Sequence, residues 1–265
     1  MTHPLITFTS DFGHDDWFVG VVHGVIHDVC PACRVVDLTH TLPPGAIAHG
    51  AFTLEAAAPD FPDGTVHLAV VDPGVGTARR ALGVRARRQW FVGPDNGLLE
   101  WALADPQAEV RSLTEERLFR HPVSRTFHGR DVFAPVAAHL ASGVAFDQFG
   151  PVVRDPVRLE SPEARLVGGT LHGRIMHIDR FGNALTNVDA GALAHAFPDL
   201  SEGELAIDAG GRRFAGVTRS YGDAPVGTVV VVLGSSGRLE IAQVGGAAAE
   251  RLGLGVGDQL LVTRR

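Results

Sequence analysis

Hydrophobic and polar positions alternate in blocks through the first half of the chain. Short apolar runs predict buried strands over residues 5–9, 34–38 and 65–71. Longer stretches with an apolar stripe at helical spacing predict helices over residues 17–29, 45–57, 96–104 and 131–142. The last of these begins with Asp131, an acidic residue that suits the positive end of a helix dipole. Strands that alternate with helices in this way are typical of an α/β fold with a mostly parallel sheet.

The pattern changes after about residue 150. Residues 151–168 are rich in proline and charge and show no apolar period, which predicts a linker. Beyond it, short β-like runs separated by glycine cover residues 171–178, 205–207, 228–233, 239–244 and 259–263. Such spacing predicts a small β-barrel. The expected organisation is an N-terminal α/β domain over residues 1–150, a linker over 151–168 and a C-terminal β-barrel domain over 169–265.

Length and composition agree with this organisation. The chain has 265 residues, of which 45% are apolar, so it can bury the cores of two domains. No apolar stretch approaches the roughly 20 residues that span a bilayer, and the N-terminus enters a strand-like run without a basic segment or cleavage signal. A cytoplasmic protein without a membrane partner is expected.

The charged residues exclude several function classes. All 23 basic residues are arginines, and no lysine occurs. The absence of lysine excludes Schiff-base and pyridoxal-phosphate enzymes, a phosphate loop ending in Gly-Lys and a Ser-x-x-Lys acyl enzyme. The net charge of −7 argues against a nucleic-acid partner. The one dense basic run, Arg85, Arg87 and Arg88, is expected on the solvated face of a strand.

Two cysteines, Cys30 and Cys33, form a single Cys-x-x-Cys motif. This spacing occurs in half of a zinc site and in redox pairs. A zinc site needs two more ligands at suitable spacing. A redox pair should open a helix, whereas Cys30 ends a predicted helix and Pro31 breaks it. Both interpretations are therefore disfavoured.

Two polar motifs directly follow predicted strands. Ser10-Asp11-Phe12-Gly13 follows the first strand, and the glycine-containing turn from Asp72 to Arg79 follows the third. Ligands of open parallel sheets gather beyond the carboxyl ends of the strands, so both motifs should meet in one crevice. The Gly74-Val75-Gly76 turn is not a dinucleotide fingerprint, because Arg79 stands where the third glycine is needed. Nicotinamide or flavin binding is disfavoured.

Together with later motifs, these segments carry a family resemblance. The further motifs are Thr126-Phe127-His128-Gly129-Arg130-Asp131, Ile178-Asp179-Arg180-Phe181-Gly182-Asn183 and Ser235-Ser236-Gly237-Arg238-Leu239-Glu240-Ile241-Ala242. In order and spacing they resemble the S-adenosylmethionine hydrolase family, also called S-adenosylmethionine hydroxide adenosyltransferases, whose halide-using relatives are the fluorinases and chlorinases. The resemblance runs from about Ile6 to the C-terminus.

The resemblance implies a fold, an assembly and a reaction. The fold is a Rossmann-like N-terminal α/β domain with a mostly parallel sheet and a smaller C-terminal β-barrel domain. The assembly is a homotrimer with sites at the subunit interfaces. The reaction is hydrolysis of S-adenosyl-L-methionine to adenosine and methionine by attack of water or hydroxide at the ribose C5′ carbon, without a metal or an organic cofactor.

Asp72, Arg79 and His128 suit the chemistry that the resemblance implies. A neutral thioether leaves a sulfonium readily, so the enzyme must instead activate a water or stabilise hydroxide. Asp72 is expected to orient the water, His128 to accept its proton and Arg79 to favour negative charge nearby. The fluorinase carries tyrosine, threonine and a Tyr-Ser pair at the positions of Asp72, Arg79 and His128-Gly129. A halide needs no base, and this chain has one.

The resemblance also implies substrate contacts. Asp11 offers paired acceptors to a ribose diol. The other implied contacts are Asn183 at the adenine edge, Phe181 as an apolar wall, Asp179 at the methionine ammonium, Tyr221 against the adenine, and Ser235 at the methionine end. Glu240 either meets the ammonium or faces outward on its strand. Ser236 stands where the fluorinase has an arginine for the methionine carboxylate, which leaves recognition of that carboxylate open.

Two further functions stay open from the residues alone. Carboxylates and imidazoles are ordinary metal ligands, so a metal-dependent hydrolase could be built from Asp11, His14, Asp15, Asp16, Asp72 and His128. A non-catalytic module could bind adenosine or S-adenosylmethionine in the same crevice and turn nothing over. Survival of activity after chelation excludes the first, and turnover with substrate in large excess excludes the second.

Overall fold

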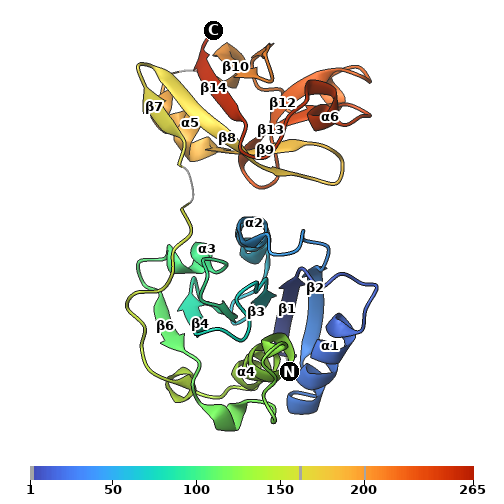
Figure 1. The fold of residues 1–265 in the computed structure, drawn as a ribbon. Helices are drawn as coiled ribbons and strands as arrows, with labels where there is room; N and C mark the ends of the chain where they lie inside the picture. Colours follow the sequence, from blue (N-terminus) through green and yellow to red (C-terminus); the bar gives the residue numbers. More distant parts are fainter. Residues whose placement is uncertain (1–2, 161–162, 200) are drawn as a thin grey trace. The chain divides into compact units, whose positions relative to one another are not determined.

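The chain divides into two compact units. The computed structural model describes residues 3–160, 163–199 and 201–265 (Figure 1). The first unit is Met1–Leu159 and the second is Glu160–Arg265. Of the stretch 151–168 that the sequence predicts as a linker, residues 151–159 belong to the first unit, and the strand β7 (Arg165–Val167) belongs to the second.

A six-stranded sheet in the order β2-β1-β3-β5-β4-β6 forms the centre of the first unit. Its strands are β1 (Leu5–Ser10), β2 (Arg34–Thr39), β3 (Val66–Val70), β4 (Ala81–Ala86), β5 (Gln89–Pro94) and β6 (Glu109–Ser112). The neighbours β2, β1, β3 and β5 run parallel, whereas β4 is antiparallel to both β5 and β6. The prediction of a mostly parallel sheet is confirmed, and the antiparallel strands are an addition that the hydrophobic pattern did not indicate.

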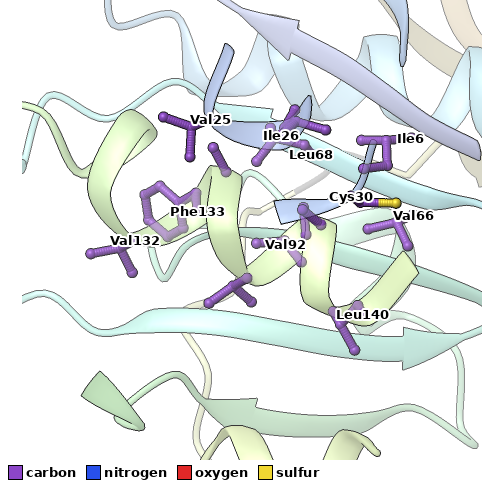
Figure 2. Packing of buried hydrophobic residues seen from close by; sticks show 14 of the residues in the cluster. Ile6, Val25, Ile26, Cys30, Val66, Leu68, Val92, Val132, Phe133 and Leu140 are labelled. Carbon is purple, nitrogen blue, oxygen red and sulfur yellow. The ribbon is translucent and has the colours of Figure 1, made fainter. Parts of the chain in front are cut away.

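Helices cover both faces of this sheet. They are α1 (Phe18–Val29), α2 (Ile47–Ala57), α3 (Glu100–Leu103) and α4 (Ala134–Ala141), with the 3-10 turns η1 (Ala58–Asp60), η2 (Glu116–Leu118) and η4 (Phe146–Phe149) and a π-helix, η3 (Gly129–Phe133). α1 and α4 share one apolar cluster with β1, β3 and β5, and Figure 2 shows Ile26 and Phe133 within it. α2 and α3 pack on the other face. All five residues of β3 are therefore buried.

Two predicted helices differ from the structure. Of residues 96–104 only Glu100–Leu103 is helical, because Asn96 folds the preceding turn by donating to the Val71 carbonyl and accepting from the Leu98 amide. Helix 131–142 becomes the π-helix followed by α4. Asp131 does not begin a helix but is buried within the π-helix.

The arginine run is only partly on a strand. Arg85 is exposed on β4, but Arg87 and Arg88 form the two-residue turn to β5, with φ of 52° and 62°. This left-handed geometry usually takes asparagine or glycine, so the sequence did not signal a hairpin. Arg87 is held there by its amide, which donates to Asp105, and by its guanidinium over the Trp101 ring.

Cys30 and Cys33 are joined by a disulfide bond. Cys30 ends α1, as expected, and both cysteines are buried in the cluster beneath that helix. The Cys-x-x-Cys spacing did not lead to a prediction of this disulfide, since both interpretations that it suggested, half a zinc site and a redox pair, were disfavoured. The burial of both residues gives the pair a packing role.

The second unit is an antiparallel, nearly closed, barrel-like sheet, which confirms the predicted barrel. Its strands follow the order β11-β10-β14-β8-β9-β13-β12, with β7 paired to β8. The elements are β8 (Thr170–Ile178), β9 (Ala184–Asp189), α5 (Ala190–Ala196), η5 (Glu202–Glu204), β10 (Leu205–Ala209), β11 (Arg212–Ala215), η6 (Tyr221–Asp223), β12 (Val229–Leu233), β13 (Arg238–Gln243), α6 (Ala248–Leu252) and β14 (Gln259–Arg264). A separate apolar cluster fills the unit. Among all described residues, no helix is long and apolar enough to cross a membrane.

We expect His67 of β3 to make the protein less stable in mild acid. The side chain is fully buried, its Nδ1 lies 2.8 Å from Thr7 Oγ1, and its ring stacks on Phe91. Burial lowers the pKa of His67 from 6.5 to about 4. Between these pH values the unfolded chain binds a proton that the folded chain does not, so the free energy of unfolding falls as the pH falls. The loss approaches about 3 kcal/mol near pH 4.

Urea unfolding from pH 7 to pH 4 measures this effect. A His67→Gln variant, which cannot titrate, should lose less stability over the same range, although it starts lower. Equal slopes of unfolding free energy against pH in both proteins would contradict the assignment.

Candidate active site

A cavity of about 420 Å³ lies in the first unit. It is lined by four segments that are far apart in the sequence. They are Asp11–Phe12, Pro44–Gly45, the residues Val70, Asp72, Pro73 and Val75, and Thr126–Gly129. Two of the segments begin where β1 and β3 end. The structure thus brings the motifs after these strands together at one sheet edge, and it adds the segment before the π-helix.

Asp72, Arg79 and His128 are in direct contact. Arg79 Nε donates to Asp72 Oδ1 at 2.9 Å and to Oδ2 at 3.1 Å, and Arg79 Nη2 also donates to Oδ2. The same Nη2 lies 2.9 Å from His128 Nδ1. The side chains of Arg79 and Asp72 are only 10% and 6% exposed. Asp72 and His128 line the cavity, whereas Arg79, which contacts both of them, does not line it.

The arginine fixes the protonation geometry of His128. A guanidinium has no acceptor, so Nη2 donates and Nδ1 must carry the lone pair. The neutral imidazole therefore holds its proton on Nε2. Burial and the charge of Arg79 lower the pKa of His128 below 6.5, against an opposing contribution from Asp72. His128 is thus a neutral ring near pH 7 with Nε2–H as its remaining polar group.

Close backbone packing holds the loops of the cavity together. Gly76 has φ of +79°, and a Cβ on it would lie 2.3 Å from the Arg125 carbonyl oxygen. Only glycine allows the turn after β3 to approach the segment that carries His128 so closely. The Arg79 guanidinium lies over the Phe133 ring at 5.1 Å, which supports it from the π-helix.

Asp131 organises the segment that carries His128. Its Oδ2 accepts from the Ser124 amide at 2.8 Å, and its carboxylate pairs with Arg130. The side chain is 1% exposed. The sequence predicted a helix terminus at Asp131 and not this structural role, although the position of Asp131 three residues after His128 in the motif was the available signal.

Asp11 is held by the segment after β2. Its Oδ2 accepts from the Gly45 amide at 2.7 Å, and the carboxylate lines the cavity. Phe12 and Phe127 form the apolar wall, with ring centroids 5.9 Å apart. Gly45, Phe12 and Phe127 are not among the site residues that the sequence suggested, although both phenylalanines lie inside its motifs.

The other predicted substrate contacts belong to the second unit. Asp179 folds the turn between β8 and β9, since Oδ1 accepts from the amides of Phe181 and Asn183 at 2.8 and 2.9 Å, and Oδ2 accepts from Asn183 Nδ2 at 2.9 Å. Asn183 is buried, whereas Phe181 is 78% exposed. Both carboxylate oxygens of Asp179 therefore accept hydrogen bonds within the turn, and the exposed ring on this turn is that of Phe181.

Tyr221 and Glu240 form a pair in the same unit. Tyr221 Oη donates to Glu240 Oε2 at 2.7 Å. Burial, together with the bond to Glu240, raises the pKa of Tyr221 to about 12. Glu240 is buried on β13, so the outward-facing alternative does not hold. Ser235 is exposed in the turn between β12 and β13.

The six residues that the sequence suggested for a metal-dependent hydrolase are not the ones that the structure brings close enough to hold a metal ion. Among the described residues, the group of ligand side chains close enough to hold an ion is His23, Asp37 and His40. None of these three belongs to the six residues that the sequence suggested, and none lines the cavity.

Comparison with known families finds two matching models. The model of the S-adenosylmethionine hydroxide adenosyltransferase N-terminal domain matches residues 6–150, and the model of the C-terminal domain matches residues 173–261. A crystal structure of an uncharacterized conserved protein from Thermotoga maritima aligns with a TM-score of 0.92 at 34% identity, covering 98% of this chain and 100% of that one.

Curated relatives agree with the family models. The chain is 42% identical over 265 residues to a protein of Salinispora tropica named (R)-S-adenosyl-L-methionine hydrolase, with 98% of each chain covered. It is 43% identical over 259 residues to a protein of that name from Thermus thermophilus, covering 94% of this chain and 95% of the relative. A fluorinase of an Actinoplanes species is 28% identical over 298 residues, covering 99% and 98%.

Proposed function

The chain belongs to the S-adenosylmethionine hydroxide adenosyltransferase family, and from this membership and the cavity of the first unit we propose that it hydrolyses S-adenosyl-L-methionine to adenosine and L-methionine. The enzyme is a hydrolase. Because the relatives at 42–43% identity carry the prefix (R) in their names, we propose the (R) sulfonium epimer as its substrate.

The observation that carries the proposal is the single guanidinium shared by Asp72 and His128. Water attacks the ribose C5′ carbon, the C5′–S bond breaks, and its electron pair stays on the methionine sulfur. The sulfonium charge disappears, and one proton is released for each turnover. The leaving group needs no acid, so the residues need only prepare the oxygen nucleophile.

The contact between Arg79 and His128 supports a different role for His128 from the proton acceptor that the sequence suggested. Nδ1 is occupied by the arginine, so the ring offers Nε2–H to the cavity. We assign His128 as the donor that holds the attacking oxygen and Asp72 as the acceptor that orients a water proton. Arg79 keeps both groups in place, and its charge favours a hydroxide-like oxygen nearby.

The remaining contacts complete the proposal. Asp11 Oδ2 is bonded to Gly45, and we propose that the other oxygen accepts from the ribose diol. Asn183, Phe181, Asp179, Tyr221, Ser235 and Glu240 are proposed to hold the adenine and methionine ends. We further propose a homotrimer, whose mass light scattering measures, with sites at the subunit interfaces. We also propose turnover without a metal or an organic cofactor, and we expect activity to survive treatment with a chelator.

Hydrolysis in oxygen-18 water tests the nucleophile. The label should enter the 5′ hydroxyl of adenosine, because the new C–O bond forms with water. Unlabelled adenosine, or 5′-chloro-5′-deoxyadenosine formed in chloride buffer, contradicts the proposal. Continuous turnover with substrate in large excess separates the enzyme from a binding module.

The acid limb of the pH profile should report His128. Burial and Arg79 lower the pKa of His128 below 6.5, so the neutral ring persists as the pH falls through that value. Protonation at Nδ1 then sets two cations against each other and breaks the contact with Arg79. We expect kcat/KM to fall only below pH 6.5.

An Arg79→Gln variant provides the matched comparison. Removal of the positive charge raises the pKa of His128, so the acid limb of kcat/KM should move to higher pH as the overall rate decreases. An acid limb at the same pH in both proteins would show that His128 does not control it.

A further inference from the structure

A second cluster of chemically capable side chains lies outside the cavity. It consists of His23 on α1, Asp37 on β2 and His40 just after β2. Asp37 Oδ1 lies 2.8 Å from His23 Nε2 and 2.9 Å from His40 Nε2. The three ligand atoms all lie within 4.8 Å of one another. The proposed reaction uses none of these residues.

One ring nitrogen of His40 is buried without a hydrogen bond of good geometry. The side chain of His40 is fully buried. Nε2 lies 2.9 Å from Asp37 Oδ1, but it makes no hydrogen bond of acceptable geometry to any described residue. A buried nitrogen without a hydrogen bond lowers the stability of the fold, and native proteins usually satisfy such an atom with a water or an ion. The atom is one of the three that converge on the cluster.

The other nitrogen of His40 is arranged as in a metal ligand. His40 Nδ1 lies 2.7 Å from Ser10 Oγ. Histidines that bind metals almost always donate from the second ring nitrogen to an oxygen, which orients the ring and leaves the first nitrogen with its lone pair. In the tautomer that carries its proton on Nδ1, His40 donates to Ser10 Oγ, and Nε2 is left with the lone pair that a metal needs.

We propose that His23, Asp37 and His40 bind a divalent transition-metal ion, with zinc as the reference ion. Two imidazole nitrogens and one carboxylate oxygen suit zinc and its neighbours, whereas magnesium and calcium prefer oxygen ligands throughout. Bonds of about 2.0–2.1 Å to a tetrahedral zinc place neighbouring ligands about 3.3 Å apart. The two nitrogen–oxygen distances need to open by only about half an ångström.

The location of the cluster indicates a stabilising ion with access to solvent. The side chains of His23 and Asp37 are 28% and 37% exposed, so an ion can enter, while His40 anchors it from inside. The ion ties α1 to β2, and through His40 and Ser10 it reaches the segment that carries Asp11. None of its ligands lines the cavity, so the ion supports the unit and takes no part in the reaction.

Zinc titration of the full-length protein tests the proposal. The purified protein is stripped with a chelator, dialysed and titrated with zinc chloride in a calorimeter. We expect one zinc per chain that is lost, or bound at least about 100-fold more weakly, in His23→Gln and in Asp37→Asn. At free zinc about 100 times Kd, the melting temperature of the wild-type protein should rise by about 5–10 °C.

The control is His27→Gln, which removes an exposed histidine one turn further along α1 and should bind zinc as the wild type does. His40 is left unchanged because its replacement endangers the fold, and circular dichroism confirms that the variants are folded. Equal zinc binding in all four proteins shows an adventitious ion only. Absence of zinc binding in the wild type shows that the cluster is a carboxylate shared by two histidines. Either result overturns the proposal, and neither depends on the reaction in the cavity.

Discussion

Replacement of His128 by alanine should lower kcat by about 10²–10⁴-fold, and Asp72→Asn should do the same. Both side chains line the cavity, and both are held by Arg79, so each variant removes one of the two groups that we propose to position the attacking oxygen. Neither group is needed to expel the thioether. The loss should therefore appear in kcat, while the affinity for adenosine changes little.

The control is His139→Ala, since His139 lies on α4 and does not line the cavity. It should keep wild-type kcat. Adenosine affinity is measured by calorimetry for all variants, and thermal melting checks that Arg79 tolerates the loss of a partner. Near-normal kcat in His128→Ala would show that His128 is only a packing residue. Asp72 and Arg79 alone would then position the attacking oxygen.

The sequence predicted the convergence of the two polar motifs that follow β1 and β3 for a physical reason. Parallel strands present their carboxyl ends at one sheet edge, and the apolar runs of β1 and β3 end where Ser10 and Asp72 begin. The contacts within the group could not be predicted in this way. That Arg79 lies between Asp72 and His128 depends on side-chain rotamers and on the Phe133 ring behind it.

The errors of the sequence analysis share a cause. Arg87 and Arg88 occupy left-handed backbone, and Asp131 is buried in a π-helix, so tertiary contacts override the local preference of each residue. Asn96 likewise delays the start of a predicted helix, because its side chain donates to the Val71 carbonyl just after β3. Periodicity reports which face is apolar, but it carries no information on such partners.

In the second unit the barrel was predictable and the detail of its loops was not. Short β-like runs separated by glycines indicated β8, β10, β12, β13 and β14, whereas the pairing of Tyr221 with Glu240 links positions 19 apart in sequence. The carboxylate of Asp179 folds its own turn, which is a common use of aspartate that competes with a binding role.

Substitution of Gly76 by alanine should abolish most activity, because the cavity depends on a contact that only glycine allows. The new methyl group would meet the Arg125 carbonyl oxygen at 2.3 Å, and that oxygen belongs to backbone that cannot rotate away. Arg125 precedes the Thr126–His128 segment of the cavity wall, so relief of the clash must move His128 away from Arg79. A displacement of about 1 Å at a reacting group costs about 10²-fold in rate.

Gly64→Ala separates this steric effect from backbone strain. Gly64 has the same φ of +79°, but a Cβ there meets nothing within 4 Å. Both variants pay about 1–2 kcal/mol for a side chain in left-handed backbone, so both should melt earlier than the wild type. Only Gly76→Ala should also lose kcat/KM by about 10²-fold and lose the acid limb that reports the contact between Arg79 and His128. If the two variants kept equal kcat/KM, the His128 segment would tolerate movement and the rigid approach of the two loops would not matter for catalysis.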